Sequence, residues 1–206
     1  LAVGEQIVRT AVERWGTIDG VVCVAGILRE RMLFNMTEDE FDSVVRVHLK
    51  GHFSLYRAAM AVMRKQDGGG SLVGFTSGAS IGSTAQPNYA AAKAGIIGLT
   101  KSAAMTGKTI SLRGGPAINA NCIAPIARTR MSENVPFEIE TGDPADVAPM
   151  AVYLMSDAGR EVTGQVFTVV GRRISVWNQP LDVRSMFAPG DRWAPEEIAD
   201  MLPRTV

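Results

Sequence analysis

Helix-like and strand-like segments alternate along the chain. Apolar residues within 1–15 recur at intervals of three and four, which places them on one helix face. The next apolar run, 18–26, is almost continuous, as expected for a strand buried on both faces of a sheet. By these criteria helices are expected at 1–15, 37–65, 88–105 and 143–155, and strands at 18–26, 71–76, 117–124 and 165–170. The order predicts an α/β fold: a three-layer, doubly wound parallel sheet with helices on both faces.

A capping signal marks the start of a helix, and a change in composition separates a domain from a tail. Thr37 precedes acidic residues 38–40, and a hydroxyl N-cap before acidic residues favours a helix start, since the helix dipole stabilises negative charge there. From Gly171 onward the sequence becomes polar and contains tryptophans and prolines, with a short helix expected at 194–202. The 206 residues therefore fit one domain, 1–171, followed by a tail, 172–206.

Composition narrows the class of protein. Hydrophobic residues make up 46% of the chain, and 21 basic residues balance 21 acidic ones. This balance gives no electrostatic reason to expect nucleic acid or a membrane surface as a partner. The sequence has no apolar run of the roughly 18 residues that a membrane helix needs. Cys23 and Cys122 lie far apart in strand-like segments, which favours buried thiols in a cytoplasmic protein over a disulfide or a metal site.

Tyr89 and Lys93 are the first candidates for chemistry. Positions four apart share a helix face, so the ammonium group can lie near the phenol. A fixed positive charge stabilises a phenolate, and we expect it to bring the pKa of Tyr89 down toward neutrality. The pair can equally be structural, but it follows a strand whose end carries Thr76 and Ser77. Ligands of parallel sheets bind at the carboxyl ends of the strands.

Several motifs then occur in a characteristic order: VVCVAGI, FTSGAS, QPNYAAAKAGIIGLTKSAA, ANCIAP and VTGQVF. With them the chain resembles the short-chain dehydrogenase/reductase family. Through ILRERM, RVHLKGHF and IAPIARTRM it is most similar to the (3R)-hydroxyacyl-CoA dehydrogenase part of the multifunctional β-oxidation enzyme and its bacterial relatives. The resemblance implies that residues 1–171 form the C-terminal part of a Rossmann-type domain. It also implies NAD or NADP as cofactor, a small-molecule substrate, and a homodimer or homotetramer.

The resemblance assigns a role to each candidate catalytic residue. Tyr89 corresponds to the acid/base, and Lys93 to its electrostatic partner and ribose ligand. Ser77 is the choice for the hydroxyl that polarises the substrate carbonyl. The family usually spaces this serine one residue further from the tyrosine, so Thr76 remains a rival.

His48 occupies the place of an asparagine that usually holds a water in a proton relay. A histidine can serve such a relay because its pKa lies near 6.5. The alternative is a structural histidine satisfied by a neighbouring helix or an interface. His52 follows four residues later, but without a nearby cysteine or carboxylate cluster no metal site is expected.

The resemblance also implies a set of cofactor-binding residues: Ala25, Gly26, Val47, Thr76, Tyr89, Lys93, Pro125, Ile126 and Thr129. Two departures from the family pattern weaken this match. Cys23 and Val24 replace a pair of asparagines, and Ile126 replaces a glycine after Pro125. Neither G-x-G-x-x-G nor T-G-x-x-x-G-x-G occurs, although a dinucleotide needs such a turn for its pyrophosphate. We therefore expect the N-terminal β-α units to be absent from this chain. Either truncation or disorder has removed them, or the protein is a degenerate relative of the family.

Together these features predict an oxidoreductase that transfers hydride between NAD(P) and a carbonyl or secondary alcohol. The implied substrate is a 3-hydroxyacyl or 3-oxoacyl thioester, or a steroid-like alcohol. The alternatives are a catalytically silent, cofactor-sensing or assembly subunit, and a lyase or epimerase on the same fold.

Overall fold

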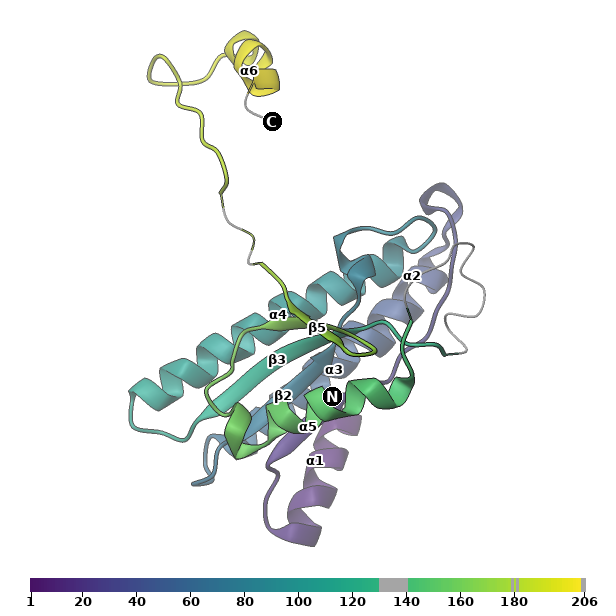
Figure 1. Cartoon of the computed structure of the whole chain (residues 1–206), viewed down its shortest axis with the longest axis vertical. Coiled ribbons are helices and arrows are strands. Elements are labelled where there is room, and N and C mark those ends of the chain that lie inside the picture. The colour runs from purple at the N-terminus through teal and green to yellow at the C-terminus, as the bar shows by residue number, and fades with distance from the viewer. Residues whose placement is uncertain (130–140, 179, 181, 205–206) are drawn as a thin grey trace.

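A single mixed sheet organises the molecule (Figure 1). The computed structural model describes residues 1–129, 141–178, 180 and 182–204. Its strands are β1 (Gly20–Cys23), β2 (Gly70–Phe75), β3 (Ile118–Pro125), β4 (Val166–Val170) and β5 (Arg173–Val176), hydrogen-bonded in the order β1-β2-β3-β4-β5. The pairs from β1 to β4 are parallel, and β5 is antiparallel to β4.

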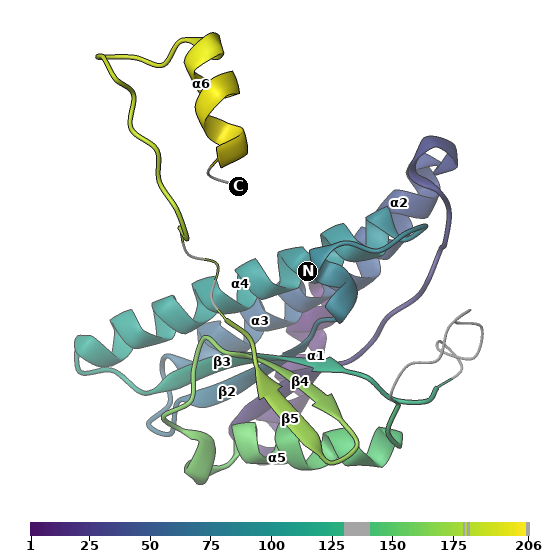
Figure 2. The same ribbon diagram turned by 45° about the horizontal axis from the view of Figure 1, so that its top comes forward.

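Helices cover both faces of this sheet (Figure 2). The α-helices of the described residues are α1 (Ala2–Trp15), α2 (Glu38–Val45), α3 (Gly51–Met63), α4 (Pro87–Leu112), α5 (Ala148–Met155) and α6 (Pro195–Met201), of which α6 does not cover the sheet. α3 and α4 lie on one face with α1 packed against α3, and α5 lies on the other. The prediction of a three-layer, doubly wound sheet is confirmed.

The hairpin formed by β4 and β5 was not expected from the sequence. Gly171 (φ +49°) lies in the tight turn between the two strands, in the left-handed region that glycine adopts without strain. β5 is mostly exposed, so it lacks the apolar run by which the buried strands were recognised. Beyond it the chain leads to α6, which lies apart from the sheet in both views.

The helix expected at 37–65 is interrupted. Its start is confirmed: the Glu40 N–H donates to Thr37 Oγ1 at 3.2 Å, and the Thr37 N–H donates to the Glu40 carboxylate at 2.9 Å. Between α2 and α3, however, Arg46–Lys50 form a π-helical turn. The apolar periodicity continues through this turn, so the sequence gives no sign of it. π turns of this kind are frequent at functional sites.

A membrane-spanning helix is absent from the described residues, where no helix is both long and apolar enough to cross a bilayer.

Candidate active site

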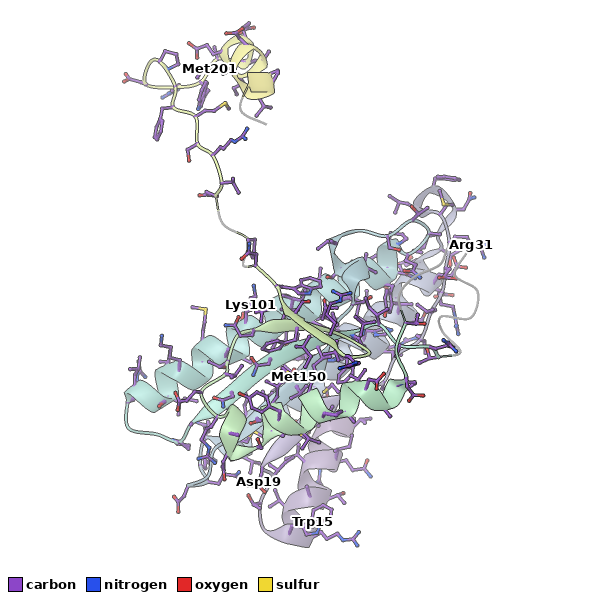
Figure 3. The ribbon with its side chains drawn as sticks, viewed as in Figure 1. Trp15, Asp19, Arg31, Lys101, Met150 and Met201 are labelled. Carbon is purple, nitrogen blue, oxygen red and sulfur yellow. The ribbon has the colours of Figure 1, made fainter. Side chains whose placement is uncertain are left out.

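The carboxyl ends of the parallel strands meet at one edge of the sheet. There β1 leads into Ala25 and Gly26, β2 into Thr76 and Ser77, and β3 into Ile126. Figure 3 labels Arg31, which follows β1 near this edge, and Asp19, which precedes β1 at the opposite edge. The sequence therefore directs its candidate residues to one side of the molecule, as expected for a parallel sheet.

The first turn of α4 is held in place by a buried amide. Asn88 Nδ2 donates to the carbonyls of Arg29 and Glu40, both at 2.9 Å, which ties α4 to the loop after β1 and to α2. Pro87 lies at the start of the helix, where the fixed φ of proline is already helical and its missing N–H leaves no hydrogen bond unmade. These contacts fix the turn that carries Tyr89.

Lys93 follows Tyr89 by one turn and is 4% exposed. Its ammonium lies 5.3 Å from the centre of the Tyr89 ring and donates to the carbonyl of Phe75 at 2.6 Å. Burial lowers the pKa of Lys93 to about 8, because the charged form loses hydration inside the protein. The lysine is thus a desolvated cation next to the phenol, as its spacing predicted.

The pKa of Tyr89 differs from the expectation. Burial raises it above the ordinary value, and the opposing effect comes from a hydrogen bond with the Ser77 side chain. The expected lowering by Lys93 was wrong for this structure, since the ammonium lies over the ring and is bound to the Phe75 carbonyl. Desolvation of the phenolate therefore outweighs the opposing effect of the Ser77 side chain.

The two hydroxyls at the end of β2 have different partners. Thr76 Oγ1 is buried and donates to the carbonyl of Lys93 at 2.9 Å, so it fastens the strand to α4. Ser77 Oγ accepts from the Ala79 N–H at 3.2 Å, and the Ser77 side chain acts to lower the pKa of Tyr89. Of the two, only Ser77 acts on the phenol.

His48 lies in the π turn and is 1% exposed. Its ring meets the Tyr89 ring edge-on, with 5.2 Å between the ring centres. His48 Nε2 lies 2.8 Å from the carbonyl oxygen and 3.0 Å from the amide nitrogen of Ile27. Nδ1 is buried and has no hydrogen-bond partner in the described part of the chain. Burial lowers the pKa of His48, and the charge of Lys93 lowers it further.

The residues expected to bind cofactor are spread around this cluster. Ala25 and Gly26 are exposed at the end of β1, and a Cβ on Gly26 would come within 2.3 Å of His48 Cε1. Val47 is half-buried beside His48 in the π turn. After β3, Pro125 and Ile126 are half-buried, and the Ile126 N–H donates to the Val169 carbonyl at 2.9 Å. Thr129 is exposed at the last described position before 130–140.

These features fit one end of a nicotinamide nucleotide. A Cβ at position 26 would collide with the His48 ring, so glycine lets the backbone lie directly against His48 while it remains exposed to solvent. The buried Lys93 ammonium carries N–H donors of the kind that ribose hydroxyls would accept from, and Nδ1 of His48 is a buried polar atom without a hydrogen-bond partner in the described part of the chain.

Sequence reasoning missed two polar residues at this edge. Asn88 was not singled out, and His52 was considered only as a metal ligand. Both side chains are buried in helices whose neighbouring residues are mainly apolar. A polar residue among apolar ones is the sequence signal by which they could have been recognised. The described residues contain no group of three or more side chains suited to hold a metal ion.

Comparisons with known proteins agree with this geometry. A family model described as "Enoyl-(Acyl carrier protein) reductase" matches residues 2–171. The crystal structure of a short chain dehydrogenase from Mycobacterium avium superposes with a TM-score of 0.85 at 39% identity, covering 98% of this chain and 68% of that one. This chain belongs to the short-chain dehydrogenase/reductase family. The resemblance inferred from its motifs is confirmed.

Two relatives indicate the branch of the short-chain dehydrogenase/reductase family. Hydroxyacyl-CoA dehydrogenase ChsB1 of Mycobacterium tuberculosis is 40% identical over 217 residues, which cover 98% of this chain and 66% of the relative. The peroxisomal hydratase-dehydrogenase-epimerase of Saccharomyces cerevisiae is 39% identical over 166 residues, which cover 80% of this chain and 18% of that enzyme. The chain thus spans just under two thirds of the mycobacterial relative and a smaller part of the yeast one.

Proposed function

We propose that the protein is an NAD(P)-dependent oxidoreductase that interconverts a secondary alcohol and a ketone. The names of its relatives favour a 3-hydroxyacyl or 3-oxoacyl thioester as substrate, with a steroid-like alcohol as the second class. One observation carries the proposal: Lys93 and His48 contact the Tyr89 ring at the carboxyl edge of the sheet, where the Ser77 side chain also acts on the phenol.

Tyr89 moves the proton at the substrate oxygen. Burial raises the pKa of its phenol, which keeps the group protonated and ready to donate to a ketone oxygen as negative charge develops there. Ser77 is positioned to donate its own hydrogen bond to the same oxygen. In the direction of alcohol oxidation, the Lys93 cation stabilises the phenolate that accepts the hydroxyl proton.

The chain's own residues also hold the cofactor. Ala25 and Gly26 would border its ribose through their backbone, and Lys93 would donate to the ribose hydroxyls. The loop from Pro125 to Thr129 would bind the carboxamide. When bound, a nicotinamide supplies or accepts the hydride at the substrate carbon.

His48 is suited to pass protons beyond Tyr89. Its Nε2 can donate to the Ile27 carbonyl or accept from the Ile27 N–H, so either neutral tautomer keeps a partner on that side. Nδ1 can therefore act as donor or acceptor. We propose that it contacts a water that connects the site to solvent, the role of the asparagine that His48 replaces.

The proposal is tested with the complete protein, NAD⁺ or NADP⁺, and a set of secondary alcohols that includes a 3-hydroxyacyl thioester. Formation of reduced nicotinamide is the expected result. With deuterium on the carbinol carbon, the label should appear in the nicotinamide ring, which separates hydride transfer from lyase or epimerase chemistry. Failure to reduce either nucleotide with any of these alcohols contradicts the proposal.

A catalytically silent, cofactor-sensing or assembly subunit is the second candidate. It is favoured by Cys23 and Val24, which stand where the family has an asparagine pair. Cys23 is buried with its pKa raised to about 12, and Val24 is 59% exposed, so neither replaces the lost amides. Nucleotide binding without turnover in the same assay would favour this candidate. Assembly as a homodimer or homotetramer and a cytoplasmic location stay predictions.

A further inference from the structure

His52 lies in the first turn of α3 and is only 2% exposed. Its Nδ1 lies 2.7 Å from the carbonyl oxygen of His48, in the π turn. Its Nε2 accepts from the Phe75 N–H, with 3.3 Å between the two nitrogens. One imidazole therefore joins the turn that carries His48 to the last residue of β2.

These two partners fix the protonation of the ring. A carbonyl oxygen can only accept, so Nδ1 must carry the hydrogen, and an amide N–H can only donate, so Nε2 must be bare. A proton on Nε2 would face the Phe75 N–H and break that contact. In its neutral form His52 therefore carries its hydrogen on Nδ1, although a backbone hydrogen bond with Cys23 gives the ring a second acceptor and raises its pKa.

The surroundings of His52 reinforce the neutral form. The titratable side chains around it in the described part of the chain are His48, Lys93 and Tyr56, and backbone hydrogen bonds with His48 and Cys23 act to raise its pKa. Desolvation is the largest cause that lowers its pKa, to about 4, and the cationic Lys93 acts in the same direction.

Both contacts lead directly to catalytic residues. On one side, the bonded carbonyl belongs to His48 itself. On the other, Phe75 holds the Lys93 ammonium through its carbonyl at 2.6 Å and precedes Thr76 and Ser77. A shift of the π turn relative to β2 would change the distances from His48 to Tyr89 and Ser77. Errors of about 1 Å in such distances reduce turnover by up to about 100-fold.

We propose that His52 is a positioning residue for the proton relay: its neutral ring locks the π turn that carries His48 to the strand end that holds Lys93 and Ser77. It touches neither substrate nor cofactor and acts through His48 and Phe75. The inference rests on the proposed function, but its geometry can be tested without it.

Three variants of the complete protein separate the two hydrogen bonds. His52→Phe keeps a ring and loses both bonds. The side chain of His52→Asn provides an N–H for the His48 carbonyl, and that of His52→Gln provides an oxygen for the Phe75 N–H. We expect kcat per folded molecule to fall by about 10- to 100-fold in His52→Phe, with KM for alcohol and nucleotide within about twofold. Because the bond to His48 is the shorter, His52→Asn should recover more activity than His52→Gln.

Unchanged kcat in His52→Phe would overturn the proposal. So would a loss that neither polar variant relieves, because the role would then not depend on these bonds. Melting temperatures of all variants correct the activities for the folded fraction. If His52→Phe does not fold, the comparison of His52→Asn and His52→Gln with the natural protein decides between the same outcomes.

Nitrogen-15 NMR of histidine-labelled protein gives a readout that does not depend on turnover. The signal lost in His52→Asn should come from a neutral ring with hydrogen on Nδ1 and a bare Nε2, also at about pH 6, where an ordinary histidine is largely charged. A cationic ring or an Nε2–H tautomer would contradict the inference. If the natural protein oxidises no alcohol but its His52 shows this signature, the proposed function fails while the placement of His52 stands.

Discussion

The two faces of the sheet differ most at its carboxyl edge. Beneath α5 the buried cluster is apolar: Val73, Ile123, Val147, Met150, Ala151, Leu154, Phe167 and Val169. The face beneath α3 and α4 also has an apolar core, but toward the carboxyl edge it contains buried polar side chains. These are His48, His52, Tyr56, Thr76, Asn88, Lys93 and Thr100.

The difference shows where the fold buries polar groups, which is unfavourable unless their hydrogen bonds are made. A buried polar group is tolerated only when its hydrogen bonds are made. On the α3 and α4 face most of these bonds run from side chains to backbone carbonyls and amides, which hold the proposed catalytic groups at fixed positions. Beneath α5 the buried polar side chains are Ser71, Asn119 and Asn121, toward the amino ends of β2 and β3, where the two asparagines hydrogen-bond with the backbone of 160–165. No catalytic role is proposed for that face. Substitutions on the two faces should therefore separate activity from stability.

Of the substitutions that compare the two faces, Ser77→Ala is expected to have the largest effect on activity. Loss of a hydroxyl that stabilises developing oxyanion charge should reduce kcat by about 100- to 1000-fold, with little change in melting temperature. Ser80→Ala is the matched control, since the Ser80 hydroxyl is buried and has no hydrogen-bond partner among the described residues. Steady-state kinetics of both variants provide the measurement, and equal activities would remove Ser77 from the mechanism.

The opposite outcome is expected beneath α5. Leu154 is completely buried, so Leu154→Ala should destabilise the fold by about 2–5 kcal/mol through loss of burial and creation of a cavity. The kcat of the folded fraction should not change. Val152→Ala on the exposed side of α5 is the control and should have a small effect. Urea unfolding gives the stabilities, and a specific loss of kcat in Leu154→Ala would break the contrast between the faces.

Acid should destabilise the polar face through His52. Its pKa is lowered from 6.5 to about 4 in the folded protein, so the unfolded chain binds the proton more readily. The stability is fully present above pH 6.5 and decreases as the pH falls toward 4, by about 3 kcal/mol for this group. Denaturant unfolding at several pH values measures the loss. In His52→Asn this part of the pH dependence should disappear, and its persistence would assign it to other groups.

A smaller effect is expected at Gly26. The added Cβ of Gly26→Ala would lie 2.3 Å from His48 Cε1 and displace the ring, at a cost of about 1–3 kcal/mol in stability. Activity should fall as well, because His48 moves relative to Tyr89. Gly78→Ala is the control, since nothing lies within 4 Å of its added Cβ. Equal kcat values for the two variants would show that the position of His48 does not matter.

The sequence predicted the apolar framework well, because continuous runs and helical periodicity reflect burial directly. The parallel strands β1 to β4 and the cap at Thr37 were anticipated. β5 was missed because an exposed strand has no such run. The π turn was missed because a single extra residue per turn hardly changes the apolar pattern.

The candidate site was predicted less evenly. The spacing of Tyr89 and Lys93 placed them correctly, since a helix fixes which residues share a face. The direction of the Tyr89 pKa shift was wrong because it depends on burial, which spacing does not reveal. The proposed choice of Ser77 over Thr76 depends on the directions of two neighbouring side chains, which the sequence does not reveal. The contacts of His52 could not be predicted because they join segments far apart in the sequence.

The most direct test compares Tyr89→Phe with Tyr56→Phe in the complete protein. The hydroxyl of Tyr56 is buried 3.4 Å from Thr100 Oγ1, and no catalytic role is proposed for it. Tyr89→Phe should lower kcat by about 100- to 10,000-fold, the usual contribution of a general acid/base. Tyr56→Phe should keep kcat and lose about 1 kcal/mol of stability with its hydrogen bond. A folded Tyr89→Phe protein with full turnover would contradict the account.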